Sequence, residues 1–146
     1  MAITSAICNS FKQEILEAEH NFTASTGNTF NLALYDSDAT LGAGTTAYTT
    51  SEEITNTSGT AYTAKGKALT SVTPTLDSST AVCDFADVSW TSASFTARGC
   101  LIYNDSHSTD ASVCAIDFGG DKTATSGTFT IQFPAAAATT AIVIIA

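Results

Sequence analysis

The stretch DFADVSWTSASFTARGCLIYN, residues 84–104, is the densest apolar, aromatic and β-branched segment of the chain. In its second half Thr96 and Arg98 alternate with apolar residues, which is the two-residue period of a strand with one buried face. From Cys100 to Ile102 both faces are apolar, so this part is expected to cross the middle of a core. The stretch therefore predicts two strands joined by a turn. The apolar residues of the second strand are Phe95, Ala97, Gly99, Leu101 and Tyr103.

The apolar positions change parity before the predicted turn. Cys83 and Phe85 occupy odd positions, whereas Val88 and Trp90 occupy even ones. A change of parity within a strand indicates an inserted residue, so we predict a β-bulge at residues 86–87.

The rest of the chain carries further strand patterns between turn-rich stretches. Pro74 lies inside one of them and assigns that strand to a sheet edge, while GGDKTATSG, residues 119–127, is expected to be a loop. The C-terminal AIVIIA, residues 141–146, is apolar throughout and must be paired and covered. About eight strands predict an all-β fold, an antiparallel β-sandwich or jelly-roll-like architecture. The other expected strands are a half-buried one at 30–35 and further ones near 71–77, 113–118 and 128–133.

Only the N-terminus predicts a helix. Over residues 4–20 the apolar positions recur every three or four residues, and Thr4 or Ser5 can cap the first turn. Residues 36–60 are poor in large apolar side chains and rich in Gly, Ser and Thr, so a long surface excursion that touches a partner is expected there. We therefore expect a single domain, 1–146, in which 4–20 is the helix and 29–146 the sandwich.

The charge balance excludes some classes of function. Acidic residues outnumber basic ones 14 to 5, the net charge is -9, and the basic residues are scattered. Nucleic-acid binding is not expected, because it needs clustered Lys and Arg. Neither a membrane span nor a Sec signal is expected, since there is no basic n-region and no long apolar run.

Four widely spaced cysteines lie in apolar surroundings and are expected to be free thiols used as core residues. If two of them pair, Cys100 and Cys114 are the candidates, because they can face each other across a hairpin. The other two are Cys8 and Cys83.

The histidines and the polar turn after residue 104 are candidates for a catalytic or metal site. His20 and His107 lie far from any serine elbow and are expected to face solvent. Asp105 and Asp110, with His107, can in principle converge on Zn or Mn, but such turn residues are abundant without metal and EF-hand spacing is absent.

Acidic residues elsewhere allow two further readings. Asp36 and Asp38 allow a calcium site, although a turn-forming role is favoured. Asp84, Asp87 and Asp117 lie beside strands, where a carboxylate pair would suit a glycosidase, but surface acids explain them better. The glycines at 42, 44, 119 and 120 lack the spacing of a phosphate loop. No catalytic, cofactor-binding or metal-ligating residue is therefore assigned, and the chain is predicted not to be an enzyme.

Motifs along nearly the whole chain resemble a family of small virion proteins of tailed bacteriophages. They are MAITSAICNSFKQEIL, FNLALYDSDATL with TTAYTT, FADVSW followed by FTARGCLIYN, and AIDFGGDKTATSGTFTIQFPA. The segment TNTSGTAYTAKGKAL departs from the Gly-rich form of this region in the family. The resemblance implies a virion structural protein and brings no catalytic residues.

From that resemblance we expect a capsid decoration, or cement, protein that binds the major capsid protein on the virion surface after assembly in the host cytoplasm. Trimers at three-fold positions between major capsid subunits are expected, with the helix face or residues 36–60 in contact. The reason to expect self-association is the apolar segment AIVIIA, which one small sandwich cannot cover. A tail or baseplate component is the alternative. A carbohydrate-binding module or small hydrolase is more distant, because Trp90 is expected in the core instead of on a sugar platform.

Overall fold

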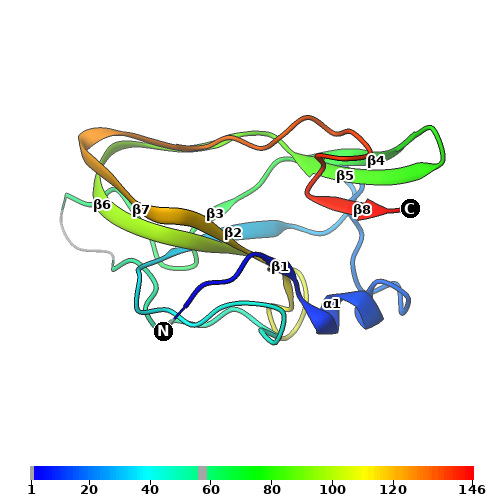
Figure 1. The fold of residues 1–146 in the computed structure, drawn as a ribbon, viewed down its shortest axis with the longest axis horizontal. Helices are drawn as coiled ribbons and strands as arrows, with labels where there is room; N and C mark the ends of the chain where they lie inside the picture. The colour runs from blue at the N-terminus through cyan, green and yellow to red at the C-terminus, as the bar shows by residue number, and fades with distance from the viewer. Residues whose placement is uncertain (1, 56–58) are drawn as a thin grey trace.

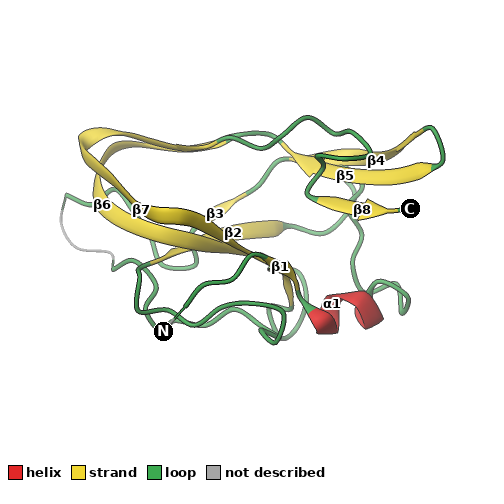
Figure 2. Cartoon of the chain, in the orientation of Figure 1, coloured by secondary structure: helices red, strands yellow, loops and turns green. Residues whose placement is uncertain are grey.

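The computed structural model describes residues 2–55 and 59–146, so positions 56–58 of the predicted excursion lie outside the described residues. The described chain is mostly β, with two antiparallel sheets and one short helix, which confirms the sandwich-like fold class (Figure 2). A five-stranded sheet has the order β1-β7-β6-β2-β3, and a three-stranded sheet the order β4-β5-β8. The elements are β1 (Ala6–Ile7), α1 (Asn9–Glu14), β2 (Phe30–Tyr35), β3 (Lys67–Ala68), β4 (Ser71–Asp77), β5 (Thr80–Phe85), β6 (Val88–Asn104), β7 (Ser112–Ile131) and β8 (Val143–Ile145).

The long hairpin β6–β7 follows β5 and precedes β8, so both of its ends continue into the three-stranded sheet. Its strands have 17 and 20 residues. Figure 1 shows it leaving the region of the three-stranded sheet, curling at its far end and returning alongside β2. The turn predicted within β6 and the loop predicted at 119–127 are both wrong, because the strands continue through these positions.

Bulges on both strands bend the hairpin where the turn was predicted. Between Trp90 and Ala93 the register leaves one extra residue on β6, and between Ala93 and Phe95 one extra residue on β7. Ser92 and Ser126, within these bulges, have positive φ angles of 53° and 48°. Since a bulge bends its strand and increases the local twist, the sheet curls without ending.

The glycine-rich segment forms a larger bulge in β7. The register passes from Ala97↔Lys122 to Gly99↔Asp117, which leaves three extra residues on β7. Gly119 has a φ of +75°, a conformation that glycine adopts without steric penalty. The Gly, Thr and Ser content that predicted a loop therefore produces a bulge inside a strand.

The parity change at residues 86–87 has a different cause from the predicted bulge. There the chain leaves β5 in one sheet and enters β6 in the other. The apolar positions change parity because they belong to two strands that face the core from opposite layers.

Both faces of β2 are buried, so its predicted half-burial is wrong. On one face Phe30 packs against Phe22 and Phe85, with ring centroids 4.3 and 5.8 Å apart. On the other face Tyr35 lies under residues 36–55, whose Ala39 and Leu41 are also buried. The predicted central run Cys100–Ile102 is confirmed as fully buried.

The helix is shorter than the predicted 4–20. It has six residues, because Ala6–Ile7 pairs with β7 as β1 and so belongs to the sheet. After Glu14 the chain makes turns, and Ala18 adopts a left-handed φ of 64°, which cannot continue a helix. The predicted sandwich boundary at residue 29 is therefore also wrong, since the N-terminal segment supplies a strand.

The smaller sheet matches two further expectations. β4, which contains Pro74, is an edge strand as predicted. β8 pairs with β5, so the C-terminal segment is paired but only partly covered: Ile144 is 39% and Ile145 56% exposed.

All four cysteines are buried and free. The register places Cys100 opposite Ile116 and Cys114 opposite Ile102, so the two candidates for pairing are diagonal neighbours and do not directly face each other. Burial raises the pKa of the Cys114 thiol to about 12, which keeps it protonated.

Leu101→Ala is expected to lower the free energy of unfolding by about 2–5 kcal/mol, because truncating a fully buried side chain leaves a cavity. Urea denaturation followed by circular dichroism measures the loss. Leu16→Ala is the matched control: Leu16 is 88% exposed, and its truncation should change stability by less than about 0.5 kcal/mol. Equal losses in the two variants would contradict this assignment of the core.

Candidate functional site

A buried carboxylate attaches the 36–55 excursion to the sheet. Glu53 Oε1 accepts hydrogen bonds from the Tyr62 hydroxyl at 2.7 Å and the Lys65 backbone N–H at 2.8 Å. Its Oε2 accepts one from the Tyr48 hydroxyl at 2.6 Å. A buried carboxylate needs such donors, so Glu53 holds the excursion to the segment that contains Tyr62 and Lys65.

The chain's four tyrosines all lie around this carboxylate. Tyr35 donates to the Thr49 carbonyl at 2.7 Å, and Tyr103 to the Lys65 carbonyl at 2.8 Å. Burial raises the pKa of every one of these phenols well above its ordinary value. They are neutral hydrogen-bond donors that anchor loops, and no sequence motif predicted the cluster.

His20 is buried in the core, so its predicted solvent exposure is wrong. Its Nε2 lies 2.8 Å from Glu14 Oε2, and its Nδ1 lies 3.1 Å from Asn104 Nδ2. Because Asn104 Oδ1 accepts from the Ser106 N–H, the Asn104 amide nitrogen faces His20. His20 Nδ1 is then the acceptor, and Nε2 carries the proton toward Glu14. His20 thereby connects the end of α1 to the end of β6.

Other side chains form ion pairs with all three residues of the possible metal loop. Lys65 Nζ lies 3.3 Å from Asp105 Oδ1 and 2.9 Å from Asp110 Oδ2, so the two carboxylates share a lysine. His107 is half-buried and turns its Nε2 to Glu19 at 3.5 Å. The arrangement is an ion-paired turn that ties the β6–β7 connection to the Lys65 segment.

Asp36 and Asp38 lie beside Glu52, with one carboxylate oxygen from each within 4.8 Å of the others. Asp36 Oδ1 accepts the Asp38 backbone N–H at 2.9 Å, which is the turn-forming role favoured from the sequence. Glu52 was not predicted, because only the folding of the excursion brings it next to the aspartates. All three side chains are at least partly exposed, and such acidic groups are common on surfaces without a bound ion.

Each of the three strand-associated aspartates accepts a hydrogen bond from a backbone N–H. Asp84 is buried and accepts its neighbour Phe85's N–H at 2.8 Å, and burial raises its pKa. Asp87 accepts the Phe133 N–H at 2.9 Å. Asp117 pairs with Arg98 Nε at 2.9 Å, which lowers the pKa of Asp117.

Trp90 is only 3% exposed, which confirms its expected place in the core. Its ring packs against those of Phe95 and Phe129 at 6.3 and 6.2 Å between centroids. It offers no face for stacking a sugar.

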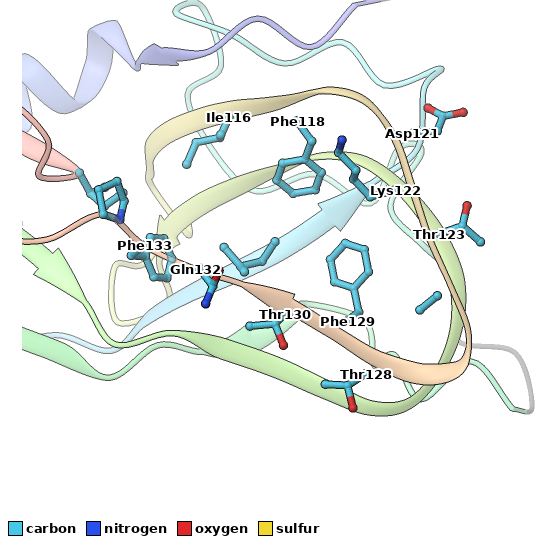
Figure 3. A pocket seen from close by; sticks show the side chains of 14 residues that line it. Ile116, Phe118, Asp121, Lys122, Thr123, Thr128, Phe129, Thr130, Gln132 and Phe133 are labelled. Carbon is cyan, nitrogen blue, oxygen red and sulfur yellow. The ribbon is translucent and has the colours of Figure 1, made fainter.

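The curl of the hairpin leaves a groove of about 760 Å³, here called the curled groove. Figure 3 shows Ile116 and Phe118 on one arm of β7, with Phe129 on the other arm and Phe133 just beyond it. Only Asp121 and Lys122 among its lining residues are charged. A concave wall that is mainly apolar, with threonines and a glutamine among the apolar side chains, suits a protein surface. Sequence reasoning missed it because residues 119–127 were expected to be a loop.

The buried tyrosines predict a cooperative alkaline transition. A phenol whose pKa is raised by folding contributes stability that is fully present below its unfolded pKa of 10.0 and is lost as pH rises toward the folded pKa. Tyrosinate absorbance is therefore expected to appear only together with unfolding, as followed by circular dichroism. Tyrosine ionisation near pH 10 in the still-folded protein would contradict the network.

Asp84→Asn and Asp117→Asn are expected to change stability in opposite directions. The pKa of Asp84 is raised above 3.8, so its contribution to the stability of the fold is present at acid pH and is lost as pH rises through the folded pKa. The pKa of Asp117 is lowered, so its contribution is present above 3.8 and lost as pH falls through the folded pKa.

Thermal unfolding between about pH 3 and pH 7 tests both variants. Relative to the wild type, Asp84→Asn should gain melting temperature as pH rises, and Asp117→Asn should lose it. If the melting temperatures of both variants change with pH in parallel, the burial of Asp84 and the ion pair of Asp117 would be contradicted.

Within residues 2–55 and 59–146, no helix has the length and apolar character to span a membrane. The geometry offers hydrogen-bonded structural clusters and an apolar groove. No protein-family model, curated protein or solved structure matches the chain.

Proposed function

We propose that this chain is a virion structural protein, a capsid decoration or cement protein that binds the outer shell of a tailed phage head and stabilises it. The observation that carries the proposal is the curled groove, a large apolar concavity suited to protein contact. The motifs that resemble small phage virion proteins supply the biological setting.

The charge distribution supports this role. A net charge of -9 favours solubility of the free protein and disfavours attachment to the packaged genome. A protein that binds only the mature shell stabilises it by mass action. Copies repeated by symmetry multiply the effect over the lattice.

The excursion is the proposed contact with the major capsid protein. The Glu53 network and the Tyr35↔Glu53 and Ala47↔Ala111 bridges hold residues 36–55 on the sheet. A surface ordered before binding loses less conformational entropy in the complex. The short helix α1 provides less surface than the predicted helix face.

We also propose trimers, formed through the curled groove. Its half-buried apolar side chains gain from burial, and its rim carries one acid and one lysine, so copies of an acidic chain can meet there without strong like-charge repulsion. The C-terminal strand gives less reason for self-association than the sequence suggested, because β8 is paired with β5 and Val143 is buried.

Cryo-electron microscopy of intact particles tests the location. Density for the two-sheet fold on the outer shell, in icosahedral copy number, is the expected result. A bare shell with this density in the tail would replace the decoration role with that of a tail or baseplate component.

Phe118→Asp is expected to abolish trimers, because it places a charge inside the curled groove. Sedimentation velocity at micromolar concentration measures the oligomer. Thr91→Asp, on an exposed position of β6 outside the groove lining, is the matched control and should leave it intact. A strictly monomeric wild type would contradict self-association.

A further inference from the structure

A second apolar groove lies between the three-stranded sheet and the segment after α1. This groove, here called the edge groove, has a volume of about 450 Å³. Val143 and Ile145 of β8 form part of one wall, and Ile15 and Ala18 part of the other. Figure 1 shows β8 between β5 and α1, at the same end of the molecule.

β8 is the edge strand on this side. Within the described residues it pairs only with β5, so its other side has no strand partner. An edge strand of this kind presents unpaired backbone N–H and C=O groups to an added strand. The exposed apolar side chains of β8 itself, Ile144 at 39% and Ile145 at 56%, provide contacts for residues of such a strand.

The surroundings of the edge groove are acidic. Residues 13–25, 72–85 and 141–146, which supply its walls and their neighbours, contain no Lys or Arg. Glu17 and Glu19 flank the groove residue Ala18, and both are exposed. The acids in these segments are Glu14, Glu17, Glu19, Asp77 and Asp84.

We propose that the edge groove binds an extended, apolar segment with flanking Lys or Arg residues from a partner protein, which adds to β8 as a fourth strand. The free edge supplies backbone hydrogen bonds, the groove takes alternate apolar side chains, and the acids attract the basic flanks. A second copy of this chain is a poor occupant, because it carries a net charge of -9. The proposal does not depend on the virion role, since any partner with such a segment would fit.

Two synthetic peptides with the same alternating Val-Thr core test this chemistry, one flanked by lysine pairs and the other by glutamate pairs. Fluorescence anisotropy with the full chain measures affinity. The lysine-flanked peptide is expected to bind saturably, at least about tenfold more tightly than the glutamate-flanked one, and to weaken with added salt. Slower amide hydrogen exchange in β8 of the complex would show strand addition.

Ala18→Arg places a long cation in the edge groove. It is expected to lower the affinity for the lysine-flanked peptide about tenfold or more. Leu16→Arg is the matched control: it adds the same charge at an 88% exposed position outside the groove lining, and should change affinity by less than about threefold. Ile145→Lys is a second groove variant, at a side chain already half exposed, so its loss of binding is separable from misfolding. Thermal unfolding verifies that each variant is folded.

Three outcomes would overturn the proposal. The first is no saturable binding of the lysine-flanked peptide, or equal binding of both peptides. The second is unchanged affinity in Ala18→Arg and Ile145→Lys. The third is a wild-type oligomer that Ala18→Arg converts to monomer, because the groove would then hold a second copy. A shell without bound protein in electron microscopy would remove the decoration role and leave this result unaffected.

Discussion

The bend of the β6–β7 hairpin is the constraint on which the rest of the structure depends. A straight pair of strands this long would expose one apolar face over much of its length. The bulges around Ser92 and Ser126 curl the pair, so that Trp90 and Phe129 on one arm pack against Phe95 nearer the other arm. The same curl creates the curled groove, because the concave side of a bent sheet cannot be filled completely by its own side chains.

Hydrogen-bonded clusters then hold the loops against this framework. Glu53 and the four tyrosines hold the excursion against β2 and β6. His20 joins α1 to Asn104 at the end of β6. In each cluster the polar side chains form hydrogen bonds with one another. Glutamate and histidine, which also occur in catalytic sites, therefore have structural partners here. Removing one member of such a cluster would leave a buried polar atom without its partner, which is destabilising.

The surface of this acidic chain has two mainly apolar grooves. The curled groove and the edge groove lie on different elements and differ in charge: the first has a mixed rim, the second an acidic one. That difference is the reason we propose different partners for them, copies of the same chain for the curled groove and a basic segment for the edge groove.

The sequence by itself determined the fold class, the position of β2, the edge position of the Pro74 strand and the buried run Cys100–Ile102. These follow from hydrophobic period and proline chemistry, which act over a few residues. Burial of His20, the contact of Glu52 with Asp36 and the ring of tyrosines around Glu53 were decided only by the tertiary structure, because each joins segments far apart in the chain. The bulges also belong to this group: Gly, Ser and Thr mark a break in regular geometry, but whether the chain turns or continues depends on the strand that pairs across it. The curled groove arises from that pairing, and the edge groove arises where the segment after α1 packs near β8. Neither could therefore be predicted from local pattern.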